Sequence, residues 1–435
     1  MTACLDRGPD LGTLTELDRA ARRILAANWR RHATVPAARL YPHQWSWDSA
    51  FIAIGQRHLS PARAQRELEA LFGAQWRDGR VPHIVFDPSV PAGAYFPGPS
   101  FWRSTAVPGT PGVPTSGIVQ PPAHALAVWL TFLAGPATAR ARGFLPRMYP
   151  RLVAWHRYLT TRRDLTGSGL MSVVHPWESG MDNSPTWDEP LSRVVPVPSA
   201  EFTRRDLDHA VAAERPTDLD YGRYVRLARD YRDAGYADTA GGHGFTVEDP
   251  LCNALLAAGE HALASIAGEV GADPGPHRSA AARLTETLTT NLYDGFFFPR
   301  DVHTGRLLRS YTIGGLMPLV VPGLPVAGAL VETALGDRFR LGAATPLPSY
   351  DLTAPGHTPG DYWRGPGWVN TSWLFWHGLR LHGHEALAGD LRGRLLDRVR
   401  EAGFREYLDP LTGAGHGADR FSWTAALVLD LIRAR

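Results

Sequence analysis

The stretch His-Pro-Trp-Glu-Ser-Gly-Met-Asp-Asn-Ser-Pro-Thr-Trp-Asp, residues 175–188, places three carboxylates and two tryptophans within fourteen residues. Its prolines and glycine favour a shaped loop over a helix. Aromatic rings stack on sugar faces, and their apolar bulk raises the pKa of a carboxylic acid so that it can protonate a leaving oxygen. The stretch therefore suits hydrolysis of a sugar linkage, although a solvated surface loop would contain the same residue types.

Two further segments mix aromatic and charged side chains in the same way. Residues 40–51 read Leu-Tyr-Pro-His-Gln-Trp-Ser-Trp-Asp-Ser-Ala-Phe, with the single acid Asp48 among the rings. Residues 362–368 read Tyr-Trp-Arg-Gly-Pro-Gly-Trp and lead into a helix that is apolar on most sides, which is typical of a buried helix. In a competing interpretation, the tryptophans of the first segment only fill the core and Asp48 caps a helix.

Helical spacing of apolar residues predominates in the rest of the chain. It predicts roughly twelve helices in antiparallel pairs, in which apolar helices are followed by amphipathic ones, and the acid- and aromatic-rich segments fall on the loops between them. This pattern indicates an all-α fold, a toroid of six helical hairpins with its loops gathered at one end. A solenoid of stacked pairs is the alternative, but it should show a sequence period, and none is visible. The predicted helices lie at about 13–29, 48–59, 61–72, 120–132, 146–159, 221–234, 250–270, 276–292, 368–382, 385–402 and 422–433, and residues 315–335 are predicted to form short helices broken by Pro318, Pro322 and Pro325.

We expect one catalytic domain over residues 1–435, with a long loop insertion at about 79–117. That insertion is rich in proline and glycine, and loops of this length in compact domains usually cover a functional site. Its aromatic residues argue against a disordered segment. Residues 292–309 alternate around two glycines and predict a small β-hairpin.

Composition excludes several classes of function. The net charge of +2 implies neither a nucleic-acid nor a membrane partner, and all 45 basic residues are arginines, so no mechanism can use a lysine. Cys4 and Cys252 do not resemble a disulfide framework, the N-terminus does not resemble a signal peptide, and no apolar run has spanning length, so we expect a cytoplasmic location. No metal-ligand spacing and no phosphate-binding glycine loop is present.

Taken together, residues 44–51, 177–185 and 362–368 resemble the inverting α-glycosidases of glycoside hydrolase family 63 and, more distantly, the trehalases. Glu406-Tyr407 and residues 421–424 resemble the C-terminal end of that fold, so the resemblance covers about residues 13–434. The family fold is an (α/α)6 barrel, which agrees with the number of predicted helices. The chain's length resembles the bacterial branch that cleaves mannosylglycerate or glucosylglycerate.

The resemblance implies two catalytic carboxylates. Asp182 in Ser-Gly-Met-Asp-Asn-Ser-Pro matches the general acid, and Glu406 in Arg-Glu-Tyr matches the general base. An inverting glycosidase needs this division of roles, because one carboxyl protonates the leaving oxygen while the other activates water on the opposite face of the ring. Glu401, Asp409 and Asp419 are rival candidates for the base.

The remaining motif residues would shape the substrate site. We expect the sugar subsite to contain Tyr41, Trp45, Trp47, Asp48, Trp177 and Glu178, with Arg364 either pairing with a site acid or holding its own loop. A glycerate aglycone needs a clamp for its carboxylate, which an arginine fork fits well. Arg215 is the first candidate for that clamp, and Arg204, Arg205 and Arg223 are substitutes. Beside it, the resemblance places Tyr95, Gln120, Tyr362 and Trp363.

The predicted activity is hydrolysis of a small α-glucoside or α-mannoside, with glucosylglycerate or mannosylglycerate first, by two carboxylates and without a cofactor or metal. Another disaccharide or short oligosaccharide, such as trehalose or kojibiose, stays open as the substrate. A sugar epimerase built on the same barrel is a second class, and its chemistry relies on histidines, of which His43, His83, His175, His357 and His377 are candidates. A carbohydrate-binding barrel without catalysis is a third.

Overall fold

The computed structural model describes residues 12–434 of the chain. Cys4 and the N-terminal residues considered for a signal peptide lie outside the described residues. Within the described part, no helix is both long and apolar enough to cross a membrane.

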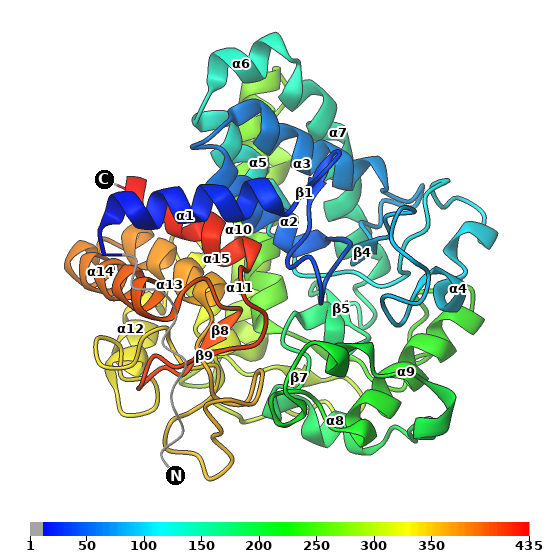
Figure 1. The fold of residues 1–435 in the computed structure, drawn as a ribbon. Helices are drawn as coiled ribbons and strands as arrows, with labels where there is room; N and C mark the ends of the chain where they lie inside the picture. Colours follow the sequence, from blue (N-terminus) through cyan, green and yellow to red (C-terminus); the bar gives the residue numbers. More distant parts are fainter. Residues whose placement is uncertain (1–11, 435) are drawn as a thin grey trace.

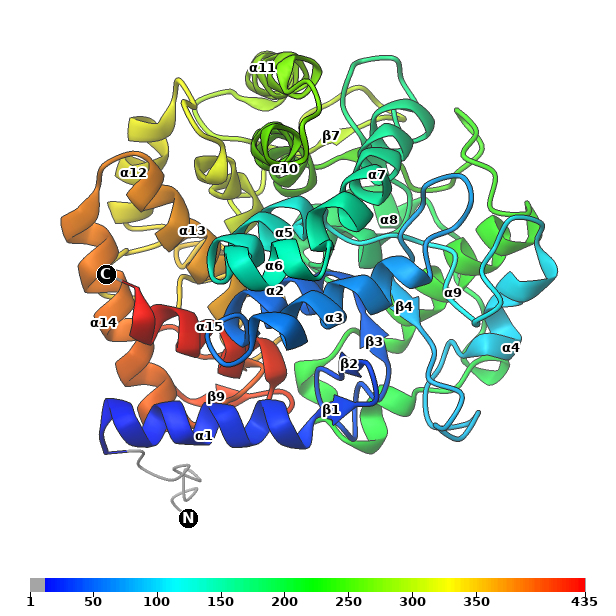
Figure 2. The ribbon, with the colours of Figure 1, turned by 90° about the horizontal axis from the view of Figure 1, so that it is seen from above.

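Six helical segments form a closed inner ring within residues 12–434, in which each segment packs against the next and the last packs against the first. Figure 2 shows α10, α13 and α15 of this ring lying inside the outer helices. In chain order the ring consists of α2 (Ser46–Gln56), α5 (His124–Leu133), α10 (Pro250–Val270), the 3-10 turns η8 (Ile313–Gly315) and η9 (Met317–Val320), α13 (Val369–Leu381) and α15 (Ser422–Arg433).

Each inner segment is preceded in the chain by an outer helix that packs on the ring. This alternation of outer and inner helices is an (α/α)6 barrel, so the predicted fold class is confirmed. The outer helices are α1 (Leu14–Ala27) on α15, α3 (Pro61–Gly73) on α2 and α5, α7 (Phe144–Arg157) on α5 and α10, α11 (Gly275–Leu292) on α10, α12 (Ala327–Leu335) on η9, and α14 (Glu385–Ala402) on α13 and α15.

Helices and short strands in the connections between the hairpins complete the described fold. Figures 1 and 2 both show α4, α8 and α9 gathered on one side of the barrel. The additional helices are α4 (Pro99–Trp102), α6 (Pro136–Ala141), α8 (Asp188–Ser192) and α9 (Asp218–Asp233). The strands pair antiparallel as β1 (Trp29–Arg30) with β2 (Ala33–Thr34), β3 (Gln44–Trp45) with β4 (Ile84–Val85), β5 (Ser172–Val173) with β6 (Val247–Glu248), β6 with β7 (Arg300–Asp301), and β8 (Tyr407–Leu408) with β9 (Gly415–His416).

Local sequence signals explain where these helices begin. A capping box of Thr13 and Glu16 starts α1, and the Asp249 side chain caps α10 by accepting from the Cys252 amide, with Pro250 in the first turn. The distribution of apolar residues around each helix then determines whether the helix lies in the inner ring or outside it. α2 and α10 are buried around nearly their whole circumference, whereas α1 buries one apolar stripe.

The fourth inner position is filled by two 3-10 turns, in line with the broken helices predicted at 315–335, because Pro318 and Pro322 interrupt any longer helix. Another segment differs from the prediction. The hairpin predicted at 292–309 is present only as isolated bridges, and β7 within it is instead the edge of a three-stranded sheet with β5 and β6. The loop at 79–117 is packed in place, with Trp102 fully buried.

The ring closes where α2 meets α15. Gly55 lies so near the other helix that a Cβ there would stand 2.0 Å from the Ala426 carbonyl oxygen. Beside this contact, Asn28 donates to Ser422 Oγ at 2.9 Å. The first and last hairpins of the barrel therefore depend on each other for their packing.

Candidate active site

A cavity of about 780 Å3, counting its open mouth, lies among the loops that enter the inner helices. Twelve of the fourteen predicted site residues line it. They are Tyr41, Trp45, Trp47, Asp48, Tyr95, Gln120, Trp177, Asp182, Arg215, Tyr362, Trp363 and Glu406. Segments from five of the six hairpins thus meet at one place, as a closed barrel requires.

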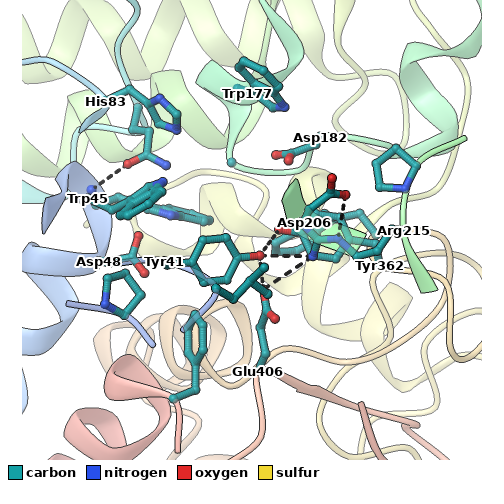
Figure 3. A pocket seen from close by; sticks show the side chains of 18 of the residues that line it. Tyr41, Trp45, Asp48, His83, Trp177, Asp182, Asp206, Arg215, Tyr362 and Glu406 are labelled. Carbon is teal, nitrogen blue, oxygen red and sulfur yellow. Dashed lines mark hydrogen bonds and ion pairs between the residues drawn. The ribbon is translucent and has the colours of Figure 1, made fainter. Parts of the chain in front are cut away.

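Asp182 lies on the loop that follows the 3-10 turn η3 (Pro176–Ser179) and points into the cavity (Figure 3). Burial raises the pKa of Asp182 to about 7, and the nearby Glu406 adds to that rise, while Arg215 opposes it. A carboxyl group with this pKa holds a proton near neutral pH and can give it to a leaving oxygen.

Hydrogen bonds within the loop hold Asp182 in place. Tyr224 donates its hydroxyl to the Asp182 carbonyl oxygen at 2.9 Å, and His175 Nδ1 accepts from the Trp177 amide at the start of η3. Gly180 has φ of +70°, and a Cβ there would lie 2.6 Å from the ring of Trp47. A glycine at this position lets the loop pack directly on a ring that lines the cavity.

Glu406 lies immediately before β8, on the far side of the cavity from Asp182 (Figure 3). Its Oε1 accepts from the Tyr41 hydroxyl at 2.9 Å, and its Oε2 accepts from the Ala418 amide at 2.9 Å. Burial raises the pKa of Glu406, and the opposing effects come from the Arg215 guanidinium and from these two hydrogen bonds, which favour the ionised form. None of the rivals, Glu401, Asp409 and Asp419, lines the cavity.

Arg215 is the one arginine among the described residues that lines this cavity. Its Nη1 donates to the Tyr41 hydroxyl at 3.0 Å and lies 3.9 Å from Glu406 Oε1, and its guanidinium stands 4.1 Å above the ring of Tyr362. The alternative clamps lie elsewhere and are paired with acids, Arg204 with Asp206 and Asp218, Arg205 with Asp208, and Arg223 with Asp220.

The structure places two predicted residues outside the cavity lining. Glu178 is fully buried behind the wall and pairs with Arg163, so its carboxylate faces the interior instead of a sugar hydroxyl. Arg364 pairs with Asp188, whose side chain is 56 % exposed, and donates to the Asn183 carbonyl oxygen. Of the two roles considered for Arg364, the structure therefore shows the one that ties loops together.

Sequence reasoning missed one charged group of the lining, Asp206. Arg204 holds this carboxylate through two hydrogen bonds, of 2.9 and 2.8 Å, and the Nε of Arg215 stands 3.6 Å from it. The available signal is an acid that directly follows the pair Arg204-Arg205 in an irregular segment. Aromatic lining residues that were also missed include Phe96, Tyr221, Trp368, Phe421 and Trp423.

Histidines contribute little to the cavity. Of the five candidates, only His83 lines it, and burial lowers the pKa of His83 to about 3. His175 caps its own loop, and His43 packs edge-on against Phe86. Between residues 12 and 434, no three His, Cys, Asp or Glu side chains are grouped closely enough to hold a metal ion.

Comparisons with known proteins show which family the chain is similar to. The family described as mannosylglycerate hydrolase MGH1-like glycoside hydrolase domain matches residues 41–424. The chain is 41% identical to a mannosylglycerate hydrolase of Rubrobacter radiotolerans over 95% of this chain and 96% of the relative, and 37% identical to a glucosylglycerate hydrolase of Mycolicibacterium hassiacum over 96% and 98%. The crystal structure of a GH63 mannosylglycerate hydrolase from Thermus thermophilus with Tris and D-glycerate is 40% identical, superposes with a TM-score of 0.87, and the match covers 96% of this chain and 100% of that one.

Proposed function

Since the chain belongs to glycoside hydrolase family 63, in its mannosylglycerate hydrolase MGH1-like group, it is a glycosidase, and we propose that it hydrolyses the α-glycosides of glycerate with inversion. Glucosylglycerate and mannosylglycerate are the proposed substrates. The observation that carries this proposal is Arg215, a guanidinium in a ring-lined cavity between two carboxylates, Asp182 and Glu406. An aglycone with one carboxylate fits that charge.

In the proposed mechanism, Asp182 is the general acid. It gives its proton to the glycosidic oxygen as the bond between that oxygen and the anomeric carbon breaks. Support comes from the raised pKa of Asp182, because a buried carboxyl of this kind is protonated when substrate binds near neutral pH.

Glu406 is the proposed general base. It takes a proton from a water molecule whose oxygen attacks the anomeric carbon from the face opposite the leaving group. This step inverts the configuration of that carbon. Two observations support the assignment: Glu406 faces Asp182 across the cavity, and its two oxygens are held by Tyr41 and Ala418.

The sugar would lie among the rings at the inner end of the cavity. Trp45, Trp47 and Trp177 offer apolar faces there, and Asp48 is a buried acceptor for ring hydroxyls. Burial raises the pKa of Asp48 well above its usual range, so the group can also donate a hydrogen bond.

The glycerate would lie toward Arg215. A guanidinium fork binds a planar carboxylate through two parallel hydrogen bonds, and Nη1 is the one atom of this fork with a hydrogen bond to another described side chain. We propose Tyr95, Gln120, Tyr362 and Trp363 as the neighbouring contacts, since all four line the same cavity.

We also propose that residues 1–435 form a single catalytic domain, with 79–117 as an inserted loop beside the cavity. The breadth of the family match supports this. The relatives are named for small glycoside substrates, and a cytoplasmic enzyme without nucleic-acid or membrane partners fits the near-neutral net charge. Hydrolysis by two carboxylates needs no cofactor.

The test is a time course on glucosylglycerate, mannosylglycerate, trehalose, kojibiose and maltose, with NMR identifying the anomer released. We expect turnover of a glycerate glycoside with release of the β-anomer. In the Arg215→Ala variant, kcat/KM for that substrate should fall about 10²-fold, the loss of a bound charge pair, and much less for the disaccharides. Arg205→Ala, outside the cavity, is the matched control. Turnover of a disaccharide alone, or equal losses on all substrates, would overturn the proposed substrate.

A further inference from the structure

A short hydrogen-bonded chain joins Arg215 to Glu406. Arg215 Nη1 donates to the Tyr41 hydroxyl at 3.0 Å, and that hydroxyl donates to Glu406 Oε1 at 2.9 Å (Figure 3). Nη1 itself stands 3.9 Å from the same carboxylate oxygen. The group proposed to hold the aglycone is therefore connected to the proposed base both directly and through one phenol.

In the free enzyme, this connection lowers the basicity of Glu406. A nearby cation stabilises the carboxylate form of Glu406, and so makes it a weaker acceptor of a proton from water. Tyr41 adds to the effect, because a hydroxyl that accepts from a guanidinium becomes a stronger donor to its own acceptor. The Tyr362 hydroxyl oxygen lies 3.4 Å from the Tyr41 hydroxyl oxygen, but it has no hydrogen bond to Arg215 or Glu406 among the described residues.

Arg215 is shared between two carboxylates. Asp206 lies 3.6 Å from its Nε, and Glu406 Oε1 lies 3.9 Å from its Nη1. Among the residues that the structure describes, the lining contains no second guanidinium to balance a further negative charge. An aglycone carboxylate that binds here must therefore compete with Asp206 and Glu406 for the interaction with the Arg215 guanidinium.

We propose that the carboxylate of the aglycone activates Glu406, by drawing the charge of Arg215 away from Tyr41 and the base when the substrate binds. This inference rests on the proposed function and deepens it: the glycerate group accelerates the chemical step in addition to contributing to substrate binding. With Arg215 engaged, Glu406 takes the proton of the attacking water more readily while Asp182 protonates the departing oxygen.

The consequence concerns which kinetic constant carries specificity. A clamp that only holds the substrate lowers KM and leaves kcat unchanged. A clamp that also strengthens the base raises kcat, and a substrate without the carboxylate loses kcat even at saturation. We expect a kcat difference of about tenfold, a part of the roughly 10²–10⁴-fold that general base catalysis contributes.

The experiment compares 2-O-glycosylglycerate with the matching 2-O-glycosylglycerol, in which CH2OH replaces the carboxylate, at saturating concentrations. In the wild type, kcat should be about tenfold higher for the glycerate glycoside. In Tyr41→Phe, the relay hydroxyl is lost while Arg215 stays, so the KM preference should persist and the kcat preference should shrink several-fold. The matched control is Tyr231→Phe, which removes a hydroxyl that donates to Asp238 outside the cavity, and this variant should keep both preferences.

A wild-type preference that lies wholly in KM would overturn the coupling and leave the proposed substrate intact. Equal kcat ratios in the wild type and Tyr41→Phe would do the same. If Tyr41→Phe does not fold, a wild-type measurement decides: the hydrolysis of an α-glycosyl fluoride, whose leaving group needs little protonation. Added D-glycerate should raise kcat for this fluoride and added glycerol should not. No acceleration by D-glycerate would overturn the proposal.

Discussion

The proposed role of Asp182 as general acid predicts the pH profile of the enzyme. Burial raises the pKa of Asp182 to about 7. A general acid acts only when protonated, so kcat/KM should be highest below pH 7 and fall about tenfold per pH unit above it. In Asp182→Asn, kcat on a glycosylglycerate should fall by about 10²–10⁴-fold, and the residual rate should lose this alkaline limb. A retained limb would assign the acid to another group.

Glu401, five residues before Glu406, is the alternative candidate for the general base, and variants of the two residues can be compared directly. Glu401 lies at the end of α14 with its side chain 60 % exposed and paired with Arg398, whereas Glu406 is buried in the cavity wall. Glu406→Gln should bind substrate and not turn it over, while Glu401→Gln should be near normal. Substrate binding by calorimetry and single-turnover assays separate the two effects. An inactive Glu401→Gln variant would instead assign the general base to Glu401.

The individual residues show the limits of inferring chemistry from sequence. Asp182 and Glu406 were predicted because each belongs to a motif that resembles a catalytic motif of the family. Glu178 belongs to the same motif as Asp182, yet its carboxylate points behind the wall, since neighbours on a tight loop face different directions. Asp206 was missed because its importance comes from its position in the cavity lining beside Arg215, and the irregular segment that contains both residues has no sequence pattern that predicts this position.

At the level of elements, Glu178 joins the loop of Asp182 to the rest of the barrel. Its two oxygens accept from the amides of Val119 and Val174, at 3.2 and 2.7 Å, and it pairs with Arg163 in the interior. Val119 precedes Gln120, which accepts from the Trp47 amide at 3.1 Å. One carboxylate therefore fixes two segments that reach the cavity.

Glu178→Gln keeps the shape of the side chain and removes its charge. Breaking a fully buried ion pair should lower the free energy of unfolding by about 3–5 kcal/mol. Asp188→Asn, which breaks the exposed pair with Arg364 near the same loop, should cost no more than about 1 kcal/mol. Urea unfolding measures both. Equal costs would show that the buried pair does not hold this loop.

The contact between α2 and α15 makes a second prediction about elements. In Gly55→Ala the new methyl group would meet the backbone of Ala426, so the helices must separate, and we expect a loss of several kcal/mol, at least the ~1–3 kcal/mol typical of overpacking. Gly389→Ala, inside α14 with open space around it, should instead stabilise the protein by about 0.5–1 kcal/mol. Thermal unfolding of the two variants gives opposite shifts; a neutral Gly55→Ala would contradict close packing.

Element boundaries could be predicted where the signal is local. The Thr13 and Glu16 box, and Asp249 before Pro250, place the starts of α1 and α10 correctly. The pairing of β7 could not be predicted, because its partner β6 lies about fifty residues earlier and is only two residues long. Strand pairing of that kind is decided by tertiary packing and not by sequence pattern.

On the scale of the whole molecule, the closed ring predicts cooperative unfolding. Each inner segment packs on both of its neighbours, so within the described residues no hairpin can leave without exposing two others. We expect circular dichroism and the fluorescence of the 14 tryptophans to report one urea transition with a common midpoint. Two resolved transitions would show that the chain is divided into separate domains.

The six-hairpin architecture was accessible from sequence because apolar and amphipathic helices alternate along the chain, and that alternation survives any error in a single boundary. What joins the hairpins was not accessible. The close approach of Gly55 to Ala426 depends on two small residues that have no distinctive local pattern.

The seam between α2 and α15 also has a consequence during synthesis. At about 5–20 residues per second, a ribosome needs on the order of 20–70 s to make residues 57–421, which separate the two helices. Throughout that interval, the face of α2 that packs on α15 in the folded protein has no partner. The proposed acid Asp182 is synthesised before the proposed base Glu406. A nascent chain that is interrupted between these two residues therefore lacks the proposed base and should be inactive.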